Sequence, residues 1–136
     1  AKNMRITGIS LVFVGVVFAL AATPLLHPIA HVFLKLAYWP LHAVPPERTV
    51  PQPLLVAISG GLTVGLGGML WATGTHVAPL SPEAAQRVAY TATWCWFATD
   101  STASILAGAP FNVVLNLSFL IPMLASARTG PALASP

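Results

Sequence analysis

Four long apolar stretches occupy most of this 136-residue chain, and they limit the folds that it can adopt. Each approaches the ~20 residues that a helix needs to cross the hydrocarbon layer of a membrane. Charged residues make up 7% of the chain, whereas a soluble domain carries about 25%. We therefore predict a single-domain, all-α integral membrane protein with four transmembrane helices, over residues 6–22, 53–73, 82–107 and 110–127.

Serine, proline and glycine mark the ends of these predicted helices. Ser81 is a suitable N-cap, and Pro82 fits the first position of a helix. Gly108 and Pro110 separate the third stretch from the fourth. Pro122 lies inside the fourth stretch, where it is expected to bend the helix near its end.

The segment between the first two stretches carries polar side chains at intervals of three or four residues. These are His27, His31, Lys35, Tyr38 and His42. This spacing places them on one face of a helix, with apolar residues over much of the remainder. We predict an amphipathic helix over about residues 29–41 that lies in the membrane interface. A short re-entrant segment is the alternative.

Lysine and arginine indicate an orientation in the membrane. Basic residues are enriched on the cytoplasmic side of spanning helices. With a cytoplasmic N-terminus, four lie inside and two outside, the inner ones being Lys2, Arg5, Arg87 and Arg128 and the outer ones Lys35 and Arg48. The sequence therefore predicts a multi-pass protein of a bacterial inner membrane with both termini in the cytoplasm.

Polar residues interrupt the third and fourth stretches at equal distances from the turn at Gly108. Asp100 lies eight residues before it and Asn116 eight after, and Ser104 and Asn112 lie four before and four after. Two antiparallel helices joined at this turn bring each pair to the same depth, about 12 Å from the turn for the outer pair. We predict a ladder of hydrogen bonds between the two helices, near the middle of the bilayer.

Asp100 is also the candidate for a functional ionisable group inside the membrane. A charged carboxylate at that depth costs about 2.5 kcal/mol or more, so it needs partners. A small proton- or solute-coupled transporter that uses Asp100 is one alternative function. Neither stretch supplies a second titratable partner near it, which favours a structural role for the ladder.

The second stretch carries small residues at helical spacing. Gly61 and Gly65 form a GxxxG pair, and Ala57 extends the same face. Small side chains allow helix backbones to approach closely in membranes. We predict that this face packs on another helix, either of a partner protein or within the chain, where Gly15 and Ala19 of the first stretch are candidates. A flat ring or a lipid tail on this face is the alternative.

His27 and His31 are spaced four residues apart, a geometry that can hold a metal ion or a tetrapyrrole. No acidic residue joins them on that face, so we predict no metal site and no catalytic residue. A haem- or bacteriochlorophyll-binding protein is a second alternative function. Its candidate ligands are His27, His31, His42 and His76.

Two resemblances to known families accompany these patterns. The segment "AHVFLKLAYWPL", residues 30–41, resembles the end of an antenna polypeptide of purple-bacterial light-harvesting complexes, which implies His31 as a bacteriochlorophyll ligand. Lys35 and the multi-span setting depart from that pattern. The layout of the whole chain, with the glycine-rich "ISGGLTVGLGGMLWA", resembles small four-helix bacterial membrane proteins of the DoxX-like kind, which implies a fold and no single chemistry.

Few titratable groups and several faces of small residues favour a protein that works by association. We predict a non-enzymatic accessory or structural subunit of a larger membrane complex, of a photosynthetic or respiratory energy-converting kind. Its expected partners are membrane lipid and other membrane subunits. The basic residues are scattered, which gives no support to nucleic-acid binding, and the single cysteine, Cys95, excludes an internal disulfide.

Overall fold

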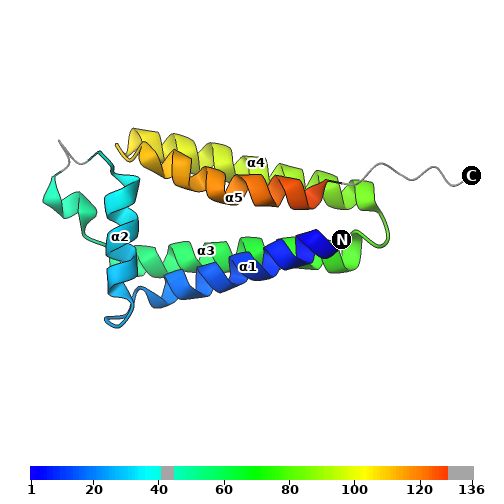
Figure 1. Cartoon of the computed structure of the whole chain (residues 1–136), viewed down its shortest axis with the longest axis horizontal. Coiled ribbons are helices and arrows are strands. Elements are labelled where there is room, and N and C mark those ends of the chain that lie inside the picture. Colours follow the sequence, from blue (N-terminus) through cyan, green and yellow to red (C-terminus); the bar gives the residue numbers. More distant parts are fainter. Residues whose placement is uncertain (41–44, 129–136) are drawn as a thin grey trace, which may run out of the picture.

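The computed structural model describes residues 1–40 and 45–128, and these residues contain five α-helices and no strand (Figure 1). The helices are α1 (Lys2–Leu20), α2 (His27–Ala37), α3 (Pro53–Ala72), α4 (Pro82–Leu106) and α5 (Phe111–Ala127). A 3-10 turn, η1 (Pro46–Thr49), precedes α3, and a π-helical turn, η2 (Thr73–Val77), extends it. The prediction of an all-α fold is confirmed.

The four long helices form two antiparallel pairs, and α2 lies across one end of them (Figure 1). One pair is α1 with α3, and the other is α4 with α5. Each predicted span coincides with one of these helices to within a few residues. The amphipathic helix, predicted over 29–41, is α2, which ends at Ala37.

The expected start and stop residues occupy the ends of α4. The Ala84 N–H donates to Ser81 Oγ at 3.2 Å, so Ser81 is the N-cap. At the other end Gly108 has a φ of 78°, which glycine adopts without a steric penalty and which reverses the chain into α5. Pro122 lies inside α5, and the helix continues beyond it to Ala127.

Two helical stretches are long and apolar enough to cross a membrane. They are Lys2–Leu20 and Pro53–Val77, with mean hydropathies of 1.8 and 1.7. Helix α5 is apolar but has only 17 residues, and α4 has 25 residues but a more polar composition. Two of the four predicted spans are therefore long and apolar enough to cross a membrane, and the other two stay predictions.

Apolar side chains point outward from all four long helices. Phe13 on α1 and Leu62 on α3 are each 70% exposed, and Ile121 on α5 is 65% exposed. Apart from Asp100, the charged residues of these four helices lie within their first six positions: Lys2, Arg5, Glu83 and Arg87. These four charges lie at the end of the helices that faces away from α2 (Figure 1), and an apolar surface of this kind is compatible with surrounding lipid.

Glycines allow the backbones of α1 and α3 to contact each other. A Cβ on Gly8 would lie 2.6 Å from the Trp71 backbone nitrogen, and one on Gly67 would lie 2.7 Å from the Gly8 carbonyl oxygen. Gly15 and Gly60 repeat this arrangement one heptad along the pair. Residues seven apart lie on one helix face, so the two glycine rows form one continuous seam.

The two helix pairs share a core at the end opposite α2. Met4 and Leu70 from one pair pack there with Ala85 and Met123 from the other, and all four are buried. A separate small core of Ala21, Ala30 and Val56 joins α2 to the ends of α1 and α3, and two cavities lie beside α2.

Candidate functional site

The predicted polar ladder is present between α4 and α5, and Asp100 is its centre. Asp100 Oδ2 accepts hydrogen bonds from Asn116 Nδ2 at 2.6 Å and from Asn112 Nδ2 at 3.1 Å. Asn112 Nδ2 also donates to Ser104 Oγ at 2.8 Å. The four residues that the sequence singled out therefore form one connected network across the helix pair.

Ser101 completes the network, and the sequence reasoning missed it. Asn116 Nδ2 donates its second hydrogen bond to Ser101 Oγ at 3.2 Å. Both Ser101 and Asn116 are buried, at 7% and 5% exposure. Its position next to Asp100 was the available signal, because adjacent residues on α4 can contact the same residue on α5.

Asp100 and Asn116 lie in the halves of α4 and α5 that are nearer to α2. Asp100 is six residues from the end of α4, about 9 Å along the axis of a 25-residue helix. Helix α4 extends well beyond α5 at the opposite end, and the depth of the ladder in a bilayer stays a prediction. Asn112 and Ser104 accordingly also line the smaller cavity beside α2.

The ladder joins two helices through neutral hydrogen-bond donors, with no cationic or metal-binding group beside it in the described residues. The ion pair found in the described residues joins Arg87 to Glu83 at 2.6 Å within the first six residues of α4, so no cation is paired with Asp100 among these residues. No group of three metal-ligating side chains occurs in the described ranges. Asn112 Oδ1 is the buried side-chain polar atom of these residues that has no hydrogen-bond partner.

The predicted packing face of α3 requires a correction. Gly61 and Gly65 are exposed, and a Cβ on either would meet nothing within 4 Å. The glycines in contact with α1 are Gly60 and Gly67, one residue before and two residues after the predicted pair. The physical reason is the helix turn of 100° per residue, which directs Gly61 away from the seam that Gly60 occupies.

Gly15 and Ala19, the predicted partner residues on α1, do lie in this seam. A Cβ on Gly15 would meet the Val64 backbone nitrogen at 2.6 Å, and Gly60 lies against the backbone of Ala19. On the predicted face, Gly61 and Gly65 therefore have no neighbour in the described chain, and Ala57 is half-buried. This face is an open strip of small residues on α3.

His27 and His31 contact each other on α2. Their rings meet edge to face with centroids 4.8 Å apart. Neither histidine lines either of the two cavities beside α2. His42 lies outside the described residues, and His76 packs against Trp71 at the far end of α3.

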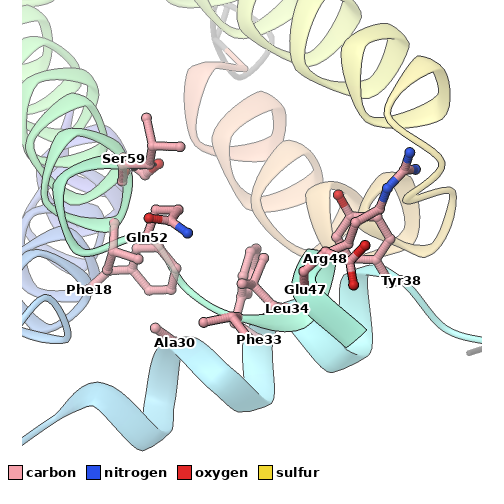
Figure 2. Close-up of a pocket in the computed structure, with 12 residues that line it drawn as sticks. Phe18, Ala30, Phe33, Leu34, Tyr38, Glu47, Arg48, Gln52 and Ser59 are labelled. Carbon is pink, nitrogen blue, oxygen red and sulfur yellow. Dashed lines mark hydrogen bonds between the residues drawn. The ribbon is translucent and has the colours of Figure 1, made fainter. Parts of the chain in front are cut away.

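The larger cavity lies where α2 meets α1 and α3, and its volume is about 300 Å³ (Figure 2). Its walls are mostly apolar and include Phe18, Phe33 and Leu34. Glu47 and Arg48 of η1 stand together with Tyr38 at one side of it (Figure 2). A second cavity of about 270 Å³ shares Phe33, Leu34 and Tyr38 and continues toward α4 and α5. The sequence reasoning missed this region.

Arg48 links η1 to the end of α4 beside α2. Its Nη1 donates to the Ala107 carbonyl oxygen at 3.4 Å, which is one of the last carbonyls of α4. A guanidinium at a helix C-terminus is stabilised by the free carbonyls and the helix dipole. This contact holds the head of Arg48 at the border of the two cavities.

Comparisons with protein-family models, curated proteins and solved structures found no match to the chain.

Proposed function

We propose that the protein is a non-enzymatic accessory subunit of a larger membrane complex in a bacterial inner membrane. In this arrangement α1, α3, α4 and α5 cross the bilayer with cytoplasmic termini, and α2 lies in the opposite interface. The exposed apolar side chains of the long helices and the position of α2 across their ends support this placement (Figure 1).

The observation that carries the proposal is the open strip of α3. Ala57, Gly61 and Gly65 form a small-residue face on which a Cβ would meet nothing at either glycine. Glycine within a helix costs about 1 kcal/mol relative to alanine, so an unused glycine pair is unfavourable in isolation. A transmembrane helix of another subunit would pack closely on this strip.

An energy-converting complex is the proposed host, because such assemblies carry many small helical subunits. The ladder around Asp100 and the glycine seam give the protein two firm helix pairs on which a partner helix can pack. No nucleophile, base or metal cluster takes part in this function, which depends on shape and surface.

The test is extraction from native membranes in mild detergent, with particle size and visible absorption recorded on the same fraction. We expect the wild-type protein to migrate with larger proteins. Gly61→Leu should release it from that particle, because the larger side chain fills the strip. Ala98→Leu, at an exposed position of α4, is the matched control and should remain bound.

A wild-type protein that migrates alone as a small oligomer would overturn the accessory-subunit proposal. Pigment or haem bands in the fraction would come from the host or from this chain. The variant His31→Ala separates these sources, since loss of the bands would assign them to α2.

A further inference from the structure

The charged pair at the rim of the larger cavity has no role in the proposed function. Glu47 and Arg48 are neighbours in η1, both line the cavity, and both are exposed. They form no ion pair with each other or with another of the described residues, where the ion pair present is Arg87 with Glu83. One positive and one negative group therefore stand side by side at the mouth of an apolar cavity.

The interior of the cavity is suited to hydrocarbon. Phe18, Phe33, Leu55 and Val56 line it from three helices, α1, α2 and α3. Phe18 and Phe33 meet edge to face with centroids 5.0 Å apart, so α1 and α2 form one aromatic wall. The polar rim and the apolar interior together fit an amphiphile with a small head group.

We propose that this cavity binds the head group and upper acyl chain of a zwitterionic aminophospholipid, of the phosphatidylethanolamine class. The Arg48 guanidinium binds the phosphate, and the Glu47 carboxylate binds the primary ammonium. The acyl chain lies along Phe18 and Phe33. The inference rests on the membrane placement in the proposed function, which puts η1 and α2 at head-group depth, and it is independent of any partner subunit.

The selectivity of this site comes from its two charged side chains, Arg48 for the phosphate and Glu47 for the ammonium. Arginine binds phosphate through a planar fork of N–H donors, and a carboxylate accepts hydrogen bonds from a primary ammonium. Phosphatidylcholine carries a quaternary ammonium that cannot donate these hydrogen bonds. Phosphatidylglycerol carries a neutral glycerol head, which leaves the Glu47 carboxylate without a cation. Both lipids should therefore bind more weakly.

The experiment is native mass spectrometry of the purified full chain in detergent, titrated separately with the three lipids. We expect phosphatidylethanolamine to bind about threefold to fivefold more tightly than either of the others, the range for an exposed charge-assisted contact. Arg48→Gln should weaken all three lipids, whereas Glu47→Gln should remove the preference for phosphatidylethanolamine over phosphatidylcholine. Glu47→Lys should reverse the preference toward phosphatidylglycerol.

Arg87→Gln and Glu83→Gln are matched controls, because they alter an exposed acid–base pair near the start of α4, the end that faces away from α2. They should leave lipid binding unchanged. Equal binding of the three lipids by the wild type, a wild-type preference for phosphatidylglycerol, or an equal effect of the control substitutions would overturn the proposal. Circular dichroism of each variant separates lost binding from lost folding. Because the assay contains no partner protein, its failure is distinguishable from a failure of the accessory-subunit proposal.

Discussion

Asp100 is the residue on which the joint between α4 and α5 depends. Its Oδ2 accepts hydrogen bonds from the side-chain amides of Asn112 and Asn116, so one atom of α4 binds both asparagines of α5. Asn116 and Asn112 each use both N–H groups of the side chain, to Asp100 and to a serine of α4. All the side-chain N–H groups of the two asparagines therefore have acceptors. Loss of the Asp100 carboxylate would leave both asparagines with an unpaired donor.

Replacement of Asp100 by leucine should reduce the free energy of unfolding by about 1–3 kcal/mol, because two interhelical acceptor contacts are lost. Asp100→Asn keeps an oxygen of similar position and should cost less than about 1 kcal/mol. Unfolding of both variants in mixed micelles, followed by circular dichroism, measures the difference. If purified protein in vesicles carries protons and Asp100→Asn abolishes that flux, Asp100 is a carrier and the structural interpretation of the ladder is wrong.

Among the elements, α3 best separates two kinds of glycine. Gly60 and Gly67 touch the backbone of α1, whereas Gly61 and Gly65 face open space. All four lie in one apolar helix, so chemical composition alone does not distinguish them. Their difference comes from the side of the helix on which each lies.

Gly67→Ala should destabilise the protein by about 1–3 kcal/mol, because the added methyl group overlaps the α1 backbone at 2.7 Å. Gly65→Ala is the matched control and should be neutral or stabilising by up to about 1 kcal/mol, through helix propensity. Denaturation midpoints of the two purified variants provide the comparison. Equal destabilisation by both would show that the seam between α1 and α3 is not set by these glycines.

The sequence predicted those features that depend on local pattern or on symmetry about one turn. Apolar stretches and capping residues located the helices, and equal distances from Gly108 placed Asp100 opposite Asn116. The predicted packing face of α3 was wrong because glycines occur on more than one face of this helix. The glycines that contact α1, Gly60 and Gly67, are seven residues apart, as are Gly8 and Gly15 on α1. The cavity at Glu47 and Arg48 depends on how α2 and η1 pack against α1 and α3, which no local pattern encodes.

At the scale of the whole molecule, the exposed thiol of Cys95 is a probe of membrane placement. It is exposed on α4, 13 residues from Pro82, which is about 20 Å along the helix. In the proposed placement lipid covers it. Leu80 is 87% exposed in the turn before α4, and in the same proposed placement it is at the water boundary.

A water-soluble maleimide should therefore fail to label Cys95 in native membranes and should label it after denaturation in detergent. The control is Leu80→Cys in a Cys95→Ser background, which should react in membranes, because a thiol needs water to ionise and attack. Gel shift with a polymer-linked maleimide measures both. Comparable labelling rates at the two sites would contradict the membrane placement of α4.

The pairing of the long helices also determines where the chain tolerates a break. Helices α1 and α3 contact each other through their backbones at the glycines, and α4 and α5 are joined by side-chain hydrogen bonds. Each helix pair therefore makes these contacts without the other pair. Between the halves runs the exposed turn at Leu80. The molecule is thus bipartite, and the two halves, made as separate polypeptides, should find each other through the small shared core around Met4 and Met123.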